Sequence, residues 1–74
     1  MLDRDKILAS LGKSIRKARE AKGLTQERLA ELAGLDSTYI SGIERGIRNP
    51  GIFSVAKIAS GLGLTLTKLM EEVK

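Results

Sequence analysis

The stretch GLDSTYISGIERGIRNP, at residues 34–50, indicates the fold more clearly than any other part of the chain. Asp36 is a favoured N-cap residue, so a helix is predicted to begin directly after it. Gly46 favours a helix end, and Pro50 prevents a helix from continuing through it. The spacing of these residues predicts one short helix, Ser37 to Arg45, followed by a loop.

The two faces of this short helix differ in chemistry. Ile40 and Ile43 lie three residues apart and share a face that suits a hydrophobic core. The outward face and its flanks carry small polar groups and arginines, namely Ser37, Thr38, Ser41, Gly42, Arg45 and Arg48. A short helix with a polar face and basic flanks is typical of a helix that lies in a nucleic-acid groove.

Four further helices are predicted around this one, at about residues 4–22, 26–33, 52–62 and 65–73. The predicted starts are Asp3 or Asp5, Thr25 and Thr65, and the predicted helix stops are Gly23, Gly34, Gly46 and Gly63. The residues expected to face inward are Ile7, Leu8, Leu11, Ile15, Ala18, Leu29, Ala30, Ala33, Ile40, Ile43, Ile52, Val55, Ile58, Ala59 and Leu62.

No stretch alternates with period two for long enough to indicate a strand, so an all-α domain over residues 1–74 is predicted. The second and third helices are joined by a turn of about three residues that contains glycine. This is the connection of a helix-turn-helix, which we place at about residues 25–45.

The composition excludes several classes of protein. The chain has no cysteine and no histidine, so it lacks a disulfide framework, thiolate or imidazole metal ligands and the commonest general base. No apolar run approaches the ~18 residues of a membrane span, and no signal peptide begins the chain, so a cytoplasmic location is expected. The net charge of +4 favours a polyanionic partner, although many unrelated small domains are equally basic.

The stretch GLTQERLAELAGLDSTYISGIERGIRNP resembles the helix-turn-helix of the Cro and phage-repressor (XRE-type) family of DNA-binding proteins. The likeness runs from about Leu11 to Leu69 and rests on short motifs in a fixed order: GLTQ, LA, IERG, RNP and LGL. The part TYISGIERGIRNP is most similar to the controller proteins of restriction–modification systems, which are small dimeric members of the family. The resemblance implies a five-helix, lambda-repressor-like fold and a transcription regulator that binds double-stranded DNA as a homodimer on a palindromic operator.

Two positions depart from the family pattern. Ser37 lies where related proteins often carry a long Arg or Gln that contacts bases, so the operator sequence stays open. Gly51 lies where the family usually has a Ser or Thr helix cap, which predicts a less firmly held start of the fourth helix.

The resemblance also implies a set of DNA contacts. The first residues of a recognition helix meet base edges in the major groove, which are Ser37 and Thr38 here. Gln26 and Tyr39 are expected at phosphates. Gly42 has two open interpretations, which are close approach to DNA on one side and tight packing or simple tolerance on the other. The whole expected set is Thr25, Gln26, Ser37, Thr38, Tyr39, Ser41, Gly42, Arg45, Arg48 and Asn49.

Two structural features are expected beside these contacts. The resemblance implies an ion pair between Arg19 and Glu44 that orients the third helix. A dimer interface is predicted on the last two helices, at about residues 52–73, because Phe53 lies one residue off the core stripe. The predicted interface residues are Phe53, Ala56, Ser60, Leu66, Met70 and Val73. The alternative is that Phe53 folds back onto its own core.

An antitoxin, or another protein-binding module on the same scaffold, is the alternative function. Such a module usually has an extension for its partner, and the sequence ends at Lys74, which favours the regulator. The carboxylates have no catalytic or metal-ligand spacing, and no glycine loop suited to phosphates is present. No enzyme activity, small-molecule substrate, metal or cofactor is therefore expected.

Overall fold

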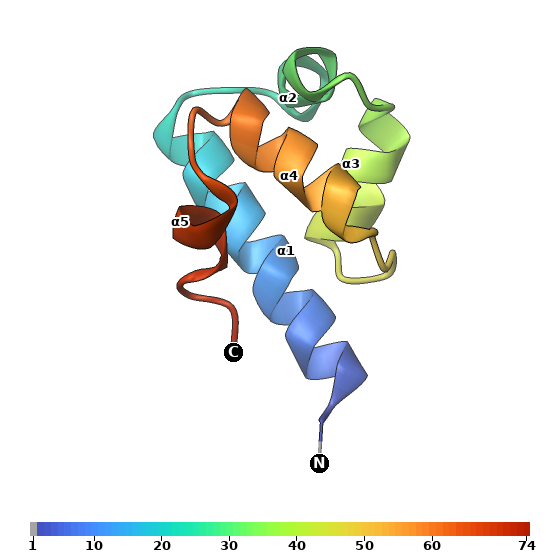
Figure 1. Cartoon of the computed structure of the whole chain (residues 1–74). Coiled ribbons are helices and arrows are strands. Elements are labelled where there is room, and N and C mark those ends of the chain that lie inside the picture. The colour runs from blue at the N-terminus through green and yellow to red at the C-terminus, as the bar shows by residue number, and fades with distance from the viewer. Residues whose placement is uncertain (1) are drawn as a thin grey trace.

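The computed structural model describes residues 2–74 and contains five helices, with no strand in that range. The helices are α1 (Arg4–Ala21), α2 (Gln26–Ala33), α3 (Ser37–Glu44), α4 (Ile52–Gly61) and α5 (Leu66–Met70) (Figure 1). The longest, α1, packs against α3 and α5, while α2 packs against α3 and α4. The predicted all-α, helix-turn-helix architecture is therefore confirmed. None of the helices in this range is long and apolar enough to cross a membrane.

Side-chain caps fix the starts of four helices. Asp3, Thr25, Asp36 and Thr65 each accept a hydrogen bond from a backbone N–H in the first turn that follows, at 2.8–3.1 Å. These bonds satisfy N–H groups that have no partner inside the helix. The fifth start, at Gly51, has no side-chain cap, as its departure from the family pattern predicted.

The helix ends follow one repeated pattern. All four glycines predicted as stops have left-handed backbone angles, with φ between 69° and 76°. The residue after each glycine donates its N–H to the carbonyl five positions earlier, as in a Schellman motif. In three of the four cases this residue packs against the core, namely Leu24, Leu35 and Leu64. Ile47, which holds the same place after α3, is instead 64% exposed.

One hydrophobic core joins the five helices. Its buried residues are Leu11, Ile15, Leu29, Ala30, Ala33, Ile40, Ile43, Val55, Ile58, Ala59, Leu62 and Leu69. Two predicted members are neither buried nor packed against this core, since Ile52 is 68% exposed and Ile7 is only half-buried. Ile52 is the first residue of α4, directly after Pro50 and Gly51, and the inward stripe of that helix begins only at Val55.

The last helix is shorter than the predicted span to Val73, because a side chain competes for its hydrogen bonding. In a longer helix the carbonyl of Leu69 would accept the N–H of Val73. That carbonyl instead accepts the hydroxyl of Ser14 on α1 at 2.7 Å, and the N–H of Val73 turns to Met70. The hydroxyl of Ser10, one helical turn earlier on α1, donates to the carbonyl of Glu72 at 3.3 Å. The chain after α5 is therefore held against α1.

Candidate nucleic-acid interface

The helix-turn-helix unit consists of α2, a short turn and α3. The turn takes a sharp change of direction at Gly34, and Asp36 then caps α3. Leu29, Ala30 and Ala33 of α2 and Ile40 and Ile43 of α3 are buried in the shared core. This packing leaves the opposite side of α3 at the surface.

The exposed side of α3 is polar, as predicted. Thr38 and Arg45 are exposed, and Ser37, Tyr39 and Ser41 are half-buried. The helix ends at Glu44, one residue earlier than predicted, so Arg45 is its C-cap residue and not its last helical residue. Gly42 differs from the rest of the set because it is buried. Tyr39 packs against the edge of the core while remaining partly accessible.

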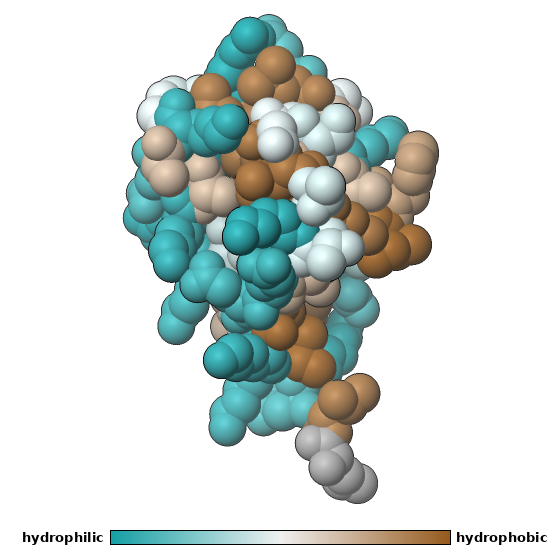
Figure 2. Space-filling model, turned by 60° about the vertical axis from the view of Figure 1, so that its left-hand side comes forward, coloured by the Kyte–Doolittle hydropathy of each residue, from teal (hydrophilic) through white to brown (hydrophobic). Residues whose placement is uncertain are grey.

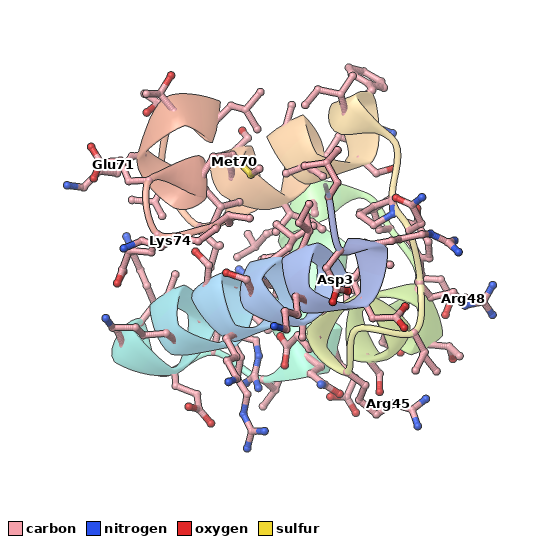
Figure 3. The ribbon with its side chains drawn as sticks, turned by 90° about the horizontal axis from the view of Figure 1, so that it is seen from below. Asp3, Arg45, Arg48, Met70, Glu71 and Lys74 are labelled. Carbon is pink, nitrogen blue, oxygen red and sulfur yellow. The ribbon has the colours of Figure 1, made fainter. Side chains whose placement is uncertain are left out.

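The loop after α3 extends the same basic surface. Arg48 and Asn49 are exposed, and Arg48 follows Arg45 by three residues. Figure 3 shows both arginines pointing away from the body of the protein, on the side of α3. Two guanidinium groups beside a helix of hydroxyl side chains can bind phosphates with charge-assisted hydrogen bonds while the hydroxyls face bases.

A partly buried ion pair holds α3 to α1, as the resemblance implied. Arg19 Nε donates to Glu44 Oε2 at 2.7 Å, and Arg19 Nη2 donates to Glu44 Oε1 at 3.1 Å. The two side chains are only 12% and 4% exposed. Arg19 Nη1 also donates to the carbonyl of Leu24 at 2.6 Å, so the guanidinium binds both the helix end and the carboxylate.

The hydrogen bond with Glu44 is the main reason that the pKa of Arg19 is raised above its ordinary value. Burial acts in the opposite direction, and the charges of Glu44 and Glu20 add to the increase. A raised pKa of a basic group contributes stability that is present below its unfolded pKa and is lost only as the pH rises through the folded value. For a guanidinium this window is strongly alkaline, so the contribution of Arg19 to stability stays constant across the neutral range.

Gln26 has a second role that the sequence reasoning missed. Its amide Nε2 donates to Glu44 Oε1 at 3.1 Å. Gln26, which was predicted to contact a phosphate, is therefore also part of the hydrogen-bond network that orients α3. The amide has a second N–H that this bond leaves free. The adjacent Thr25 is exposed, and its hydroxyl caps α2 by accepting the N–H of Arg28 at 3.0 Å. No local sequence pattern indicates the contact between Gln26 and Glu44, because 18 residues separate the two partners.

Glycine lets α1 approach the end of α3 closely. A Cβ atom on Gly12 would lie 2.4 Å from the carbonyl oxygen of Glu44 and 2.6 Å from that of Ile43. Gly12 is buried in the middle of α1, where its helix propensity is poor. The close crossing of α1 and α3 explains why a glycine is present there. One of the two carbonyls that it faces belongs to Glu44, whose side chain forms the ion pair with Arg19.

The predicted dimer residues divide into two groups. Phe53 is 72% exposed and Ser60 is exposed, whereas Ala56 is half-buried. The interpretation that Phe53 folds back onto its own core is therefore wrong. The second group lies on α5 and just after it and consists of Leu66, Met70 and Val73. These residues pack partly against the chain's own core, so they offer less free apolar surface than their spacing indicated.

Exposed apolar surface gathers at the start of α4. Ile52 and Phe53 are adjacent there, and Lys57 lies over the Phe53 ring at 5.0 Å from its centroid. Figure 2 shows hydrophobic side chains that reach the surface between hydrophilic ones. Sequence reasoning missed Ile52 in this group because it assigned that residue to the core.

Comparison with known proteins agrees with this geometry. A helix-turn-helix family profile matches residues 15–69, more than half of the chain. The chain belongs to this helix-turn-helix family. Among curated family members, it is 41% identical over 64 residues to control protein C.MunI from a Mycoplasma species, an alignment that covers 85% of this chain and 86% of that protein. It is 37% identical over 60 residues to control protein C.SmaI from Serratia marcescens, covering 81% and 71% of the two chains.

Solved structures of family members have the same fold. The restriction–modification controller protein C.AhdI from Aeromonas hydrophila matches with a TM-score of 0.82 and 44% identity, covering 84% of this chain and 94% of that one. The wild-type controller protein C.Esp1396I matches with a TM-score of 0.84 and 43% identity, covering 90% and 88%. These similarities extend over nearly all the elements described above, the helix-turn-helix included.

Proposed function

We propose that this protein is a sequence-specific DNA-binding transcription regulator of the controller type, acting as a homodimer on a two-fold symmetric site. One observation carries the proposal: the surface of α3 is polar and accessible, and exposed Arg45 and Arg48 flank it, on a helix-turn-helix scaffold. The similarity to proteins named as controllers and transcriptional regulators supports the same function over the antitoxin alternative.

Each accessible group on this surface has a role that its chemistry suits. Ser37 and Thr38 would meet base edges, since a hydroxyl donates or accepts and the threonine methyl suits thymine. The guanidinium groups of Arg45 and Arg48, together with the Asn49 amide, would bind phosphates and fix the position on the duplex. Ser41 and Tyr39, half-exposed beside them, would add hydroxyl contacts at the edges of the same groove.

The first residues of α2 would meet the backbone of the duplex from the other side. A helix N-terminus offers unpaired N–H groups and partial positive charge, which favour a phosphate beside Thr25. The free N–H of the Gln26 amide would donate to the same phosphate while its other N–H holds Glu44. A Gln26 substitution would therefore weaken both DNA binding and the orientation of α3.

The dimer would form around the start of α4. Exposed Ile52 and Phe53 supply the apolar centre, and Ala56 and Ser60, one and two turns later on the face of Phe53, are small enough for a second helix to approach. A two-fold axis here would place two α3 helices about 34 Å apart, one turn of B-DNA, which suits a palindromic site. The proposed function involves no catalysis and no cofactor, and it places the protein with the DNA in the cytoplasm.

Selection of duplexes from a random pool tests the proposal. The purified protein is incubated with the pool at physiological salt, and the retained DNA is amplified and sequenced over several rounds. We expect one enriched sequence with inverted half-sites whose centres lie about 10 base pairs apart. A pool that stays unenriched, while a known controller protein selects its site in parallel, would contradict sequence-specific binding.

A further inference from the structure

Gly42 is buried although it lies on the side of α3 that we propose to face DNA. Its carbonyl oxygen accepts two backbone N–H groups from the loop, that of Ile47 at 3.0 Å and that of Arg48 at 3.3 Å. The loop therefore folds back onto the end of α3, and the backbone of Arg48 is fixed beside Gly42.

The side chain of Arg48 occupies the space where residue 42 would otherwise carry a side chain. A Cβ atom on Gly42 would lie 2.5 Å from Arg48 Cγ, 3.4 Å from Nε and 3.5 Å from Cδ. The first distance is far shorter than the contact distance of two non-bonded carbon atoms, about 3.5–4.0 Å. The aliphatic part of Arg48 thus lies across α3, in a slot that only glycine leaves open.

This slot holds the stem from which the charged end of Arg48 extends. Arg48 remains exposed, and Figure 3 shows it extending away from the body of the protein near α3. A long side chain loses rotamer freedom when it is held by a ligand, and this loss opposes binding. Because packing on Gly42 already orders the Arg48 stem in the free protein, less freedom is lost when the guanidinium binds.

We infer that Gly42 is a positioning residue that seats Arg48 for its contact with DNA. The inference rests on the proposed function and deepens it. It also decides between the two interpretations of this glycine, since the Arg48 stem covers the position where DNA would need to approach. A methyl group at residue 42 would force Cγ, which is next to the fixed backbone, into another rotamer, and the guanidinium would leave α3.

Four variants test this role by fluorescence anisotropy on the duplex that the wild type selects. They are Gly42→Ala, Arg48→Ala, the double variant and Gly51→Ala, whose added methyl group would have no heavy atom within 4 Å. We expect Gly42→Ala and Arg48→Ala each to weaken binding about tenfold, the order of one charge-assisted hydrogen bond. In the Arg48→Ala background, Gly42→Ala should change the affinity by less than about twofold, since no seated stem remains. Gly51→Ala should bind like the wild type.

Unfolding in urea separates this effect from a folding defect. Alanine favours a helix over glycine, so the urea midpoint of Gly42→Ala should equal or exceed that of the wild type while its DNA affinity falls. The seat itself is visible without DNA, as a nuclear Overhauser effect between the Gly42 Hα and Arg48 Hγ protons. Three results would overturn the role of Gly42 and leave the proposed function standing. They are the absence of this Overhauser effect, a wild-type DNA affinity of Gly42→Ala, and additive losses of affinity in the double variant. Failure of the wild type to select any duplex would overturn the proposed function as well, even with the Overhauser effect present.

Discussion

At the scale of single residues, Glu44 connects the fold to the proposed DNA surface. Its carboxylate accepts hydrogen bonds from Arg19 on α1 and from Gln26 on α2, and it closes the last turn of α3. Three helices therefore meet at one buried carboxylate. The orientation of α3 depends on that meeting point more than on any exposed ion pair, because exposed pairs contribute little.

Removing one partner of this pair should be strongly destabilising. Arg19→Ala or Glu44→Ala leaves a charge that is mostly excluded from water, at a cost of about 3–5 kcal/mol. The free energy of unfolding, measured by urea melting of both single variants and the double variant, gives the coupling. We expect the double variant to be less destabilised than the sum of the single changes. Strict additivity would mean that the two groups do not interact in solution.

Thr38 and Arg48 should affect DNA binding in different ways. Thr38→Ala should lower the preference for the selected site by about 1–3 kcal/mol, because a base contact carries sequence information. Arg48→Ala should weaken binding to selected and scrambled duplexes alike and lower the salt slope by about one unit, because a phosphate contact releases counterions. Titrations on both duplexes at several salt concentrations distinguish the two. Equal preference and an equal slope in wild type and variants would remove these residues from the interface.

At the scale of elements, the crossing of α1 and α3 is set by Gly12. Gly12→Ala would place a methyl group against two backbone carbonyls that cannot move like side chains. We expect overpacking to lower the free energy of unfolding by about 1–3 kcal/mol, which is more than the gain of about 1 kcal/mol from the better helix propensity of alanine. The control is Lys13→Ala, an exposed neighbour in the same helix, which should be near neutral. Thermal or urea melts decide, and a stabilised Gly12→Ala would show that the helices do not approach this closely.

Local signals made the elements predictable, and long-range contacts limited the prediction. Caps such as Thr25 and stops such as Gly34 act within a few residues, so they marked helix ends correctly. The end of α5 was missed because it depends on the Ser14 hydroxyl, 55 residues away from its acceptor. Ile52 was placed in the core because helical spacing alone does not show that the buried stripe of α4 begins only at Val55.

The same limit applies to the candidate site. The polar and basic residues of α3 and its loop were predictable from the pattern of Asp36, Thr38 and Arg45 in one short stretch. The packing of Arg48 on Gly42 was not, because it depends on how the loop folds back after the helix. Spacing identified most surface residues of α3, whereas only the three-dimensional arrangement shows that Gly42 is buried and packs against Arg48.

At the scale of the whole molecule, the apolar patch at the start of α4 is the surface at which we propose that two copies of the chain meet. Phe53→Glu would place charge at the centre of the proposed interface without disturbing the core, since Phe53 is 72% exposed. We expect the wild type to sediment as a dimer at tens of micromolar, and the variant as a folded monomer with weaker binding to a two-fold site. Thr67→Glu, at an exposed position of α5, is a charge control that should stay dimeric. Monomeric wild type at that concentration would remove the interface.

Sequence-specific DNA binding by this protein can be measured in one competition titration. The wild-type protein is titrated onto its selected duplex and onto a scrambled duplex of equal length and composition, at physiological salt. We predict that the selected duplex binds at least about 10³-fold more tightly, the lower end of the range for specific DNA-binding proteins. Equal affinity for the two duplexes would contradict sequence-specific binding, because the basic surface would then act only as a non-specific polyanion site.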